Sequence, residues 1–236
     1  MAGISVCMAL YNGSRYIEEQ LNSILVQLSE EDEIIISDDG SNDGSIKKIQ
    51  DLKDPRVKLI DHAGSNNLIL NFENALTHAG GRYIFLSDQD DVWEPDKVQT
   101  MVSYLEFYDL VVSDCSIINH KGETICDSYF KLRHSGKGFL KNLIKNRYMG
   151  CCMAFNRSIL KKSLPFPQKI PMHDWWIGMV AQTYGRPFFY KKTLVKYRRH
   201  ENNASSFINQ KRYSLFEQMR FRVHLLWALF KNRAMG

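Results

Sequence analysis

Residues 83–93 read YIFLSDQDDVW, and the architecture of the chain can be inferred outward from this stretch. Tyr83–Ser87 is an apolar run of strand length, and Asp88, Asp90 and Asp91 follow it directly. A short apolar run bounded by a polar turn is typical of a buried strand. Carboxylates this close repel one another, and a divalent cation bound to substrate phosphates would compensate them. The stretch therefore predicts a buried strand that ends in a site for Mg²⁺ or Mn²⁺.

An acidic turn that caps the next helix is the alternative explanation of these acids. Asp91 or Glu94, just before Pro95, could begin a helix over Asp96–Leu105. We favour the functional explanation for the first two acids of the stretch, and both explanations remain open for Asp91.

The segments before residue 83 alternate between strand and helix patterns. Apolar runs predict strands over Ile4–Leu10, Glu33–Ser37 and Val57–Asp61. Helical spacing predicts helices over residues 15–28, Ser45–Leu52 and Asn71–His78. This alternation predicts an α/β fold, a Rossmann-like and mainly parallel sheet with helices on both faces. Ligands of such sheets bind beyond the carboxyl ends of the strands, and here those ends carry Tyr11 with Asn12, and two groups of acids, Asp38-Asp39 and Asp88–Asp91.

The second half of the chain is less regular. The expected strands are Asp109–Asn119, Gly150–Phe155, Phe188–Tyr190 and Leu194–Tyr197. The expected helices are Gly138–Lys145, a helix that opens at His173-Asp174-Trp175-Trp176, and a last one from about Gln210 to Lys231.

Composition fits one globular domain with an appendage. The 236 residues are 44% hydrophobic and 24% charged, with a net charge of +5. Residues 207–236 hold six basic residues and one acid, which leaves 25 basic and 25 acidic residues in positions 1–206. A neutral body argues against binding to nucleic acid. We therefore divide the chain into a catalytic domain, 1–206, and a basic C-terminal helix, 207–236.

The cysteines and the N-terminus indicate a cytoplasmic protein. The five cysteines are an odd number without CxxC spacing, so free thiols in a reducing compartment are expected, with neither a zinc site nor a disulfide framework. The first residues lack the basic region of a signal peptide. No apolar run approaches the ~20 residues that span a bilayer.

A second acidic strand end supports a nucleotide site. Asp38 and Asp39 precede Gly40-Ser41, which alone would be explained as a turn before a helix cap. With another acidic strand end in the same layer, one acid would bind a nucleobase or ribose while the other pins the loop. The glycine-rich dinucleotide and P-loop motifs are both absent from the sequence. A metal, together with Arg198, Arg199 or His200, would therefore have to neutralise a diphosphate.

Five motifs in this order resemble those of family 2 glycosyltransferases. They are Ala9–Asn12, Ser37–Ser41, Phe85–Trp93, His173–Trp176 and Tyr197–Asn203. The last is similar to the corresponding motif of bacterial polysaccharide enzymes, including rhamnosyltransferases. The resemblance covers residues 3–205, departs from the family at Ala9, where proline is frequent, and leaves the acceptor undefined.

The resemblance implies a GT-A fold, a nucleoside-diphosphate sugar donor, a divalent cation and inversion at the anomeric carbon. It further implies that residues 1–105 bind the nucleotide sugar and 106–206 the acceptor. By position, Asp39 would contact the base or ribose, and Tyr11 and Asn12 would also bind the nucleotide. Asp88 would contact the nucleoside, and Asp90 would bind the metal.

His200 and the aromatic segment around Asp174 complete the candidate site. His200 is either a structural histidine or a second metal ligand, and its place in a shared motif leaves these equally open. Asp174 is either a helix cap or the general base that activates an acceptor hydroxyl, and the resemblance favours the base. Candidates for acceptor binding are Trp93, His173, Trp175 and Trp176. For Trp175 and Trp176 a place in the core is the alternative.

The C-terminal segment has two apolar rows at helical spacing. One row is Phe216, Met219, Val223, Leu226, Trp227 and Phe230, and the other is Phe221, Leu225 and Leu229. Together with the net positive charge, these rows resemble an interfacial helix on an anionic bilayer. A helix that packs on the body or on a second subunit is the alternative.

We predict an inverting, metal-dependent glycosyltransferase that moves a sugar from a UDP- or dTDP-linked donor to a lipid-linked glycan. Its place would be the inner face of the cell membrane, in the synthesis of O-antigen or capsule. A sugar-phosphate nucleotidyltransferase is one alternative, but Ala9–Ser14 lacks the glycine-rich basic loop that grips a triphosphate. A non-catalytic nucleotide-sugar sensor or assembly subunit is the other, and the presence of Asp174 argues against it.

Overall fold

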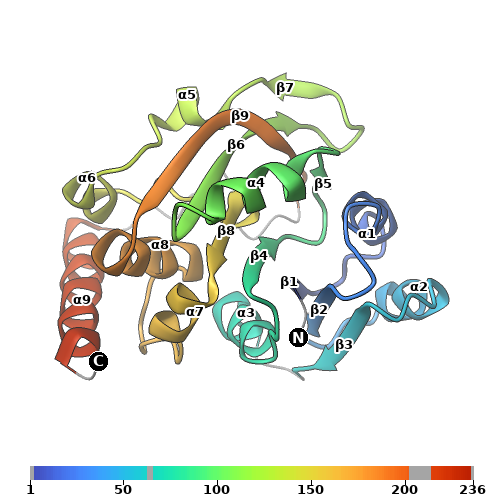
Figure 1. Ribbon diagram of the computed structural model, residues 1–236, viewed down its shortest axis with the longest axis horizontal. Helices are drawn as coiled ribbons and strands as arrows, with labels where there is room; N and C mark the ends of the chain where they lie inside the picture. The colour runs from blue at the N-terminus through green and yellow to red at the C-terminus, as the bar shows by residue number, and fades with distance from the viewer. Residues whose placement is uncertain (1–2, 63–65, 202–213, 235–236) are drawn as a thin grey trace.

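A computed structural model describes residues 3–62, 66–201 and 214–234, which form one sheet with helices against it (Figure 1). The strands are β1 (Ile4–Leu10), β2 (Glu33–Asp38), β3 (Val57–Asp61), β4 (Tyr83–Ser87), β5 (Val92–Trp93), β6 (Leu110–Ile118), β7 (Thr124–Cys126), β8 (Met153–Asn156) and β9 (Pro187–Arg198). The helices are α1 (Ile17–Leu25), α2 (Ser45–Asp51), α3 (Leu68–Thr77), α4 (Lys97–Leu105), α5 (Tyr129–Arg133), α6 (Phe139–Ile144), α7 (Arg157–Ser163), α8 (His173–Tyr184) and α9 (Leu215–Ala234). Within the described ranges, no helix is both long enough and apolar enough to cross a bilayer.

The sheet runs in the order β3-β2-β1-β4-β8-β6-β9-β5, with β7 alongside β6. Its first four strands are parallel, and Cys7 of β1 lies between Ile35 of β2 and Leu86 of β4. β8 is antiparallel to its neighbours β4 and β6, whereas β6 and β9 are parallel. The predicted α/β fold is confirmed, and its parallel part is the half in which strands and helices alternate along the chain.

The parallel strands are buried because helices lie on both sides of them. Helix α3 lies on one side, and α1 and α2 lie on the other (Figure 1). Every residue of β1 and β4 is buried, as expected for strands of a covered parallel sheet. Burial of this apolar surface, worth roughly 25 cal/mol per Å², holds the two strands at the centre of the molecule. Their carboxyl ends consequently open at one edge of the sheet.

Several predicted boundaries in the second half differ from the structure. Gly150–Cys152 forms a 3₁₀ turn, and β8 begins only at Met153. The two short strands expected over residues 188–197 are one strand, β9, because register shifts opposite Ser113–Cys115 absorb the residues between them. The sequence did not predict β5, β7, α5 and α7, which span seven residues or fewer and are too short to show a period.

Helix α9 packs one apolar row on the body and exposes the other. Leu225 and Leu229 are buried, and the hydroxyl of Tyr184 on α8 donates a hydrogen bond to the carbonyl of Leu229 (2.7 Å). Trp227 and Phe230, from the other row, are 60% and 75% exposed. The predicted start near Gln210 lies outside the described residues. Body packing thus accounts for one row, and the other remains available at the surface.

We expect Gly81→Ala to destabilise the fold by about 1–3 kcal/mol, because there is no room for a side chain where the chain enters β4. A Cβ at Gly81 would lie 2.5 Å from the backbone nitrogen of Ser5 and 2.7 Å from the carbonyl carbon of Ile4, and backbone in a central strand cannot move aside. Urea unfolding of the two proteins would measure the loss.

Gly136→Ala is the matched control, because a Cβ at Gly136 would meet no heavy atom within 4 Å. Equal unfolding midpoints for Gly81→Ala and Gly136→Ala would contradict this account of the packing between β1 and β4.

Candidate active site

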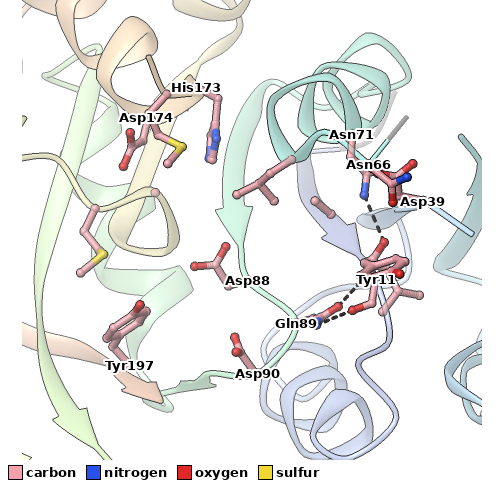
Figure 2. A pocket seen from close by; sticks show the side chains of 16 residues that line it. Tyr11, Asp39, Asn66, Asn71, Asp88, Gln89, Asp90, His173, Asp174 and Tyr197 are labelled. Carbon is pink, nitrogen blue, oxygen red and sulfur yellow. Dashed lines mark hydrogen bonds between the residues drawn. The ribbon is translucent and has the colours of Figure 1, made fainter. Parts of the chain in front are cut away.

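A cavity of about 320 Å³ opens at the carboxyl ends of β1 and β4. It is lined by Ala9, Leu10, Tyr11, Asp39, Asn66, Leu68, Asn71, Asp88, Gln89, Asp90, Met149, Gly150, Met172, His173, Asp174 and Tyr197. Figure 2 shows Asp88 and Asp90 in the middle, with Asp174 and Tyr197 on one side and Tyr11 with Asp39 on the other. The structure therefore brings six of the predicted site residues to one cavity.

The acidic loop after β4 is tied to the end of β1. Gln89 accepts a hydrogen bond from the backbone nitrogen of Tyr11 (2.8 Å) and donates one to the carbonyl of the same residue (3.0 Å). The side chain of Gln20, on α1, donates to the backbone carbonyl of Asp88 (3.0 Å). These bonds fix the direction in which Asp88 and Asp90 point.

Arg198 holds this loop from behind and does not line the cavity, contrary to the predicted diphosphate role. Its backbone nitrogen donates to Asp91 Oδ1 (2.9 Å), and its Nε donates to the carbonyl of Asp90 (2.8 Å). Its guanidinium pairs with Glu19 (2.6 Å), and the residue is only 3% exposed. Arg199 is half-buried, outside the cavity lining, and bonds through its backbone to β6. The predicted contact of Arg198 with a diphosphate therefore needs correction, because this residue is buried against the loop, whereas the role of Arg199 stays a prediction.

The two acids in the loop after β2 have different positions, as expected. Asp38 accepts hydrogen bonds from the backbone nitrogens of Gly40 (3.2 Å) and Ser41 (3.0 Å), so it pins the turn. Asp39 lines the cavity. Asn12 does not line it: its side chain accepts a hydrogen bond from the backbone nitrogen of Asn42 (2.9 Å) and so supports the turn. The predicted direct contact of Asn12 with the nucleotide therefore needs correction.

Asp174 is a buried carboxylate on the opposite side of the cavity. It is 8% exposed, and its Oδ1 accepts a hydrogen bond from the side chain of Asn146 (3.0 Å). The cap position of α8 belongs to Met172, so Asp174 is not the N-cap. Burial raises the pKa of Asp174 to about 6. A carboxylate with this pKa is ionised at neutral pH and can still accept a proton.

His173 lies beside Asp174 and is neutral. Burial lowers the pKa of His173 to about 3, and its ring stacks on Phe72 with centroids 4.0 Å apart. Neither ring nitrogen has a hydrogen-bond partner among the described residues. A buried imidazole with one N–H donor and one acceptor in a cavity is suited to a polar ligand.

The tryptophans proposed as acceptor contacts do not line the cavity. Trp93 and Trp176 are 3% and 1% exposed, and their burial makes contact with an acceptor impossible. Trp93 packs under the ammonium of Lys97 (3.8 Å to the ring centroid), and Trp176 donates to the carbonyl of Ser163 (2.8 Å). Trp175 is half-buried and donates to Asn142. The core explanation is therefore the right one for Trp93 and Trp176.

His200 lies against Asp90, with its Nε2 2.7 Å from Oδ2 of the carboxylate. Two neighbouring ligands of an octahedral ion with bonds of 2.0–2.1 Å lie roughly 3 Å apart, so this pair fits a small divalent cation. The ring of His200 also stacks on Tyr16, with centroids 5.1 Å apart. Imidazole and carboxylate together suit Mn²⁺ well.

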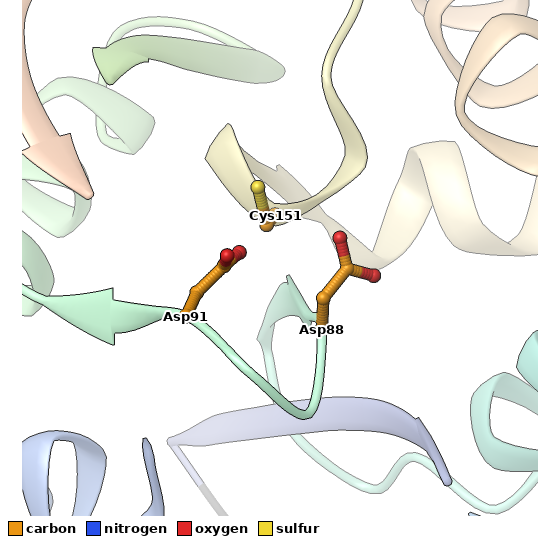
Figure 3. A group of neighbouring side chains, drawn as sticks. All are labelled: Asp88, Asp91 and Cys151. Carbon is orange, nitrogen blue, oxygen red and sulfur yellow. The ribbon is translucent and has the colours of Figure 1, made fainter. Parts of the chain in front are cut away.

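A second group of ligand atoms comes from Asp88, Asp91 and Cys151, which lie within 4.8 Å of one another (Figure 3). The hydrogen bond with Cys152 and burial raise the pKa of the Cys151 thiol, and burial beside Asp90 and Asp88 raises that of Asp91. A protonated thiol is a poor ligand for hard cations. We therefore favour Asp90 and His200 for Mg²⁺ or Mn²⁺.

The cavity holds more negative charge than its walls neutralise. Burial, followed by the charges of Asp90 and Asp174, raises the pKa of Asp88 to about 7. No lysine or arginine is among the described residues that line the cavity. The carboxylates of the cavity are therefore suited to bind a cation or hydrogen-bond donors.

Some cavity residues were not identified from the sequence. Asn71 is 2% exposed, its Nδ2 donates to the carbonyl of Leu10, and its Oδ1 has no partner in the described part of the chain. A polar residue in the first turn of an apolar helix was the available signal. Tyr197 and Met149 gave no such signal, because their patterns resemble those of core residues.

Comparisons with known proteins agree with these features. The model of the family described as Glycosyl transferase family 2 matches residues 5–164. The chain is 28% identical to the dTDP-rhamnosyl transferase RfbG of Shigella flexneri, over 83% of this chain and 72% of that protein. It is 27% identical to the UDP-Glc:alpha-D-GlcNAc-diphosphoundecaprenol beta-1,3-glucosyltransferase WfgD of Escherichia coli, over 73% of this chain and 68% of that one.

Two solved structures share the fold. TarS 1–349 of S. aureus in complex with UDP-GlcNAc matches with a TM-score of 0.74 at 18% identity, over 95% of this chain and 66% of that one. The mannosyltransferase PcManGT of Pyrobaculum calidifontis in complex with GDP-Man and Mn²⁺ matches with a TM-score of 0.66 at 19% identity, over 98% and 73%. The predicted GT-A fold is thereby confirmed. The chain spans about two thirds of the length of these relatives.

We expect Asp174→Asn to stabilise the metal-free protein by about 2–3 kcal/mol at pH 7.5. The folded carboxyl has a pKa of about 6 against a model value of 3.8, and each unit is worth about 1.4 kcal/mol. Between pH 4 and 6 the folded state holds a proton that the unfolded state has lost, so stability falls as pH rises. Asparagine cannot ionise, so the variant avoids this loss. At pH 4 the parent carboxyl is protonated in the folded state, and the stability difference between the two proteins should nearly vanish.

Asp54→Asn is the control of opposite sign. Hydrogen bonds from Arg56 lower the pKa of Asp54, so this substitution should cost stability at pH 7.5. Urea unfolding at both pH values measures the two effects. A parent more stable than Asp174→Asn at pH 7.5 would refute the raised pKa.

Proposed function

The chain belongs to glycosyl transferase family 2, and from that premise we propose that it transfers a sugar, with inversion, from a nucleoside-diphosphate sugar to a lipid-linked glycan. The observation that carries this proposal is the position of Asp174. It is a buried, basic carboxylate that faces the acidic strand ends across one cavity (Figure 2). The bacterial polysaccharide role, in O-antigen or capsule, belongs to the same proposal and is supported by the similarity to RfbG and WfgD.

We assign the donor to the side of the cavity formed by residues 1–105. Asp39 and Asn71 offer acceptors for the N–H group of a uracil or thymine base, and Tyr11 offers a ring against which the base can stack. These groups support a UDP- or dTDP-linked donor. RfbG carries dTDP in its name and TarS was solved with UDP-GlcNAc.

The divalent cation belongs next to Asp90 and His200. Their donor atoms are 2.7 Å apart, and the neighbouring Asp88 adds to the negative charge at the cavity. When bound, Mg²⁺ or Mn²⁺ would supply the positive charge that the leaving diphosphate needs. PcManGT, which shares the fold, was solved with Mn²⁺ and GDP-Man.

The acceptor side is formed by residues 106–206. Asp174 accepts the hydrogen bond of an acceptor hydroxyl and takes its proton as the oxygen attacks the anomeric carbon. The new glycosidic bond forms on the face opposite the diphosphate as the bond from the sugar to the diphosphate breaks, which inverts the configuration. Asn146 holds Asp174 in place, and the free ring nitrogens of His173 offer hydrogen bonds to the sugar.

The two alternatives have less support. A nucleotidyltransferase needs basic groups for a triphosphate, and the described cavity lining has neither lysine nor arginine. A non-catalytic sensor gives no reason for the buried, basic Asp174. We also propose a peripheral position on the cytoplasmic face of the membrane, supported by the exposed apolar row of α9, or a homo-oligomer through the same row.

We expect Asp174→Asn to lower the transfer rate about 10²–10⁴-fold, because asparagine cannot take the proton. The affinity for the donor should change little, since Asp39 and Asp90 lie across the cavity from Asp174. Hydrolysis-corrected transfer from UDP- and dTDP-sugars, with calorimetry of UDP binding, measures both. Asp127→Asn, an exposed aspartate, is the matched control, and transfer within threefold of the parent by Asp174→Asn would exclude Asp174 as the base.

Replacement of Asp90 by asparagine should weaken Mn²⁺ binding about 10–100-fold and abolish metal-dependent binding of nucleotide. Electron paramagnetic resonance of Mn²⁺ titrated into the protein measures the affinity. Cys151→Ser tests the alternative cluster and should leave the affinity unchanged. Loss of Mn²⁺ binding in Cys151→Ser with normal binding in Asp90→Asn would move the metal to the buried cluster, and full parental activity in EDTA would remove the metal altogether.

A further inference from the structure

A second cavity, of about 510 Å³, has no residue in common with the lining of the candidate active site. One of its sides is formed by α5, which packs against β6, and by the loop after α5 (Figure 1). Another side is formed by β6 and the first residues of β9. We call it the lysine cavity, because its lining includes Lys131, Lys137 and Lys191. None of the groups assigned above to sugar transfer lies in it.

A bulge in β9 brings one of these lysines to the cavity. The pairing of β9 with β6 jumps from Tyr190 to Thr193, so the two residues between them, Lys191 and Lys192, have no partner in the register. Only Lys191 of the two lines the lysine cavity. Bulges of this kind redirect a side chain and are frequent beside functional sites.

The protein does not neutralise the charge of the three lysines. Lys131, Lys137 and Lys191 are exposed, and in the described ranges of the chain no ion pair joins any of them to an acid. The lining also contains Asp114, which is 2% exposed and accepts hydrogen bonds from two backbone nitrogens (2.8 and 2.9 Å). Because these bonds stabilise its carboxylate within the body, the three ammonium groups are left for an anionic ligand.

The phenylalanines of the lining suit a saccharide better than a nucleobase. Phe188 stacks with Tyr104 and with Tyr108, at a centroid distance of 4.7 Å in both pairs, so the protein itself already uses this ring for stacking. The rings of Phe130 and Phe189 lie 5.8 Å apart and are tilted by 54°. Two tilted rings offer apolar surface to the C–H groups of a puckered sugar, whereas a planar base stacks on one flat, open face.

The loop that carries Lys137 is held in place by hydrogen bonds within the protein. Ser135 donates from its backbone nitrogen to the carbonyl of Phe130 (3.1 Å) and from its hydroxyl to the carbonyl of Arg147 (3.0 Å). The carbonyl of Gly136 accepts a hydrogen bond from a side chain of α6 (2.9 Å). Since the loop is already ordered, a ligand would bind at a smaller cost in conformational entropy.

We propose that the lysine cavity binds a saccharide that bears carboxylates. Its acidic groups pair with the three lysines, and its rings pack on Phe130 and Phe189. The site goes beyond the proposed function, because it binds a ligand without reacting with it. It is nevertheless connected to the candidate active site through one segment: the ring of Tyr148 packs against Phe189, with centroids 5.9 Å apart, and the next residue, Met149, lines the active-site cavity.

The experiment measures the binding of trigalacturonate by calorimetry at low ionic strength, in EDTA so that no divalent cation binds its carboxylates. The methyl ester of trigalacturonate has the same rings without the charge, and triglutamate has carboxylates without sugar rings. The parent should bind trigalacturonate at least about tenfold more tightly than either of these two probes.

The double variant Lys131→Gln/Lys191→Gln should lose about tenfold or more of the affinity for trigalacturonate, because two of the three charges are removed. Both lysines are exposed, so the urea unfolding midpoint should stay that of the parent. Lys192→Gln is the matched control: this lysine lies in the same bulge and is exposed, but it does not line the cavity. If the double variant fails to fold, the variant Lys191→Gln carries the test.

Equal affinities of the parent and the double variant for trigalacturonate would overturn the proposal, as would an equal loss in Lys192→Gln. An ester bound as tightly as the acid would exclude the ionic contacts, and triglutamate bound as tightly would replace the saccharide by an acidic peptide; either result overturns the proposal. The proposed function fails separately, if the parent binds trigalacturonate as expected but transfers no sugar to any acceptor.

Discussion

The mutual repulsion of the carboxylates after β4 is the constraint on which the rest of the structure depends. Such a loop would open in water, and here the buried guanidinium and backbone of Arg198 hold it in one conformation. Arg198 reaches it from the end of β9 and bonds to Asp91 and to the carbonyl of Asp90. Lys97 lies fully buried behind it, between the ring of Trp93 and the carbonyl of Cys151. The second half of the chain is thereby required for the site that the first half begins.

The negative charge of the loop is compensated on the side that faces the core and is left uncompensated on the side that faces the cavity. The arginine and the lysine serve the scaffold, and the cavity side keeps Asp88 and Asp174 with raised pKa values. Raised pKa values of acids mean that folding is less favourable at neutral pH than it would be with neutral side chains. A cation and a hydroxyl proton are partners that would lower this free-energy cost, so the cost to folding and the proposed chemistry have one origin.

The cavity also separates two kinds of recognition. On one side, Asp39 and Asn71 present fixed acceptors near the ends of β1 and β2. On the other, Asp174 is positioned by Asn146, within a segment flanked by cations. The inverting transfer that we propose needs this separation, because its attacking hydroxyl would approach from the face opposite the leaving diphosphate.

The sequence by itself determined the strands of the parallel half, the polar residues at their ends and the two rows of the last helix, because hydrophobic period and strand length are local properties of the chain. It could not determine that Arg198 would serve the loop, that Trp93 and Trp176 would be core, or that β8 would run antiparallel. Those outcomes depend on contacts between distant segments, such as the 107 positions that separate Arg198 from Asp91. Only the tertiary structure decides which face of a side chain is left for a ligand.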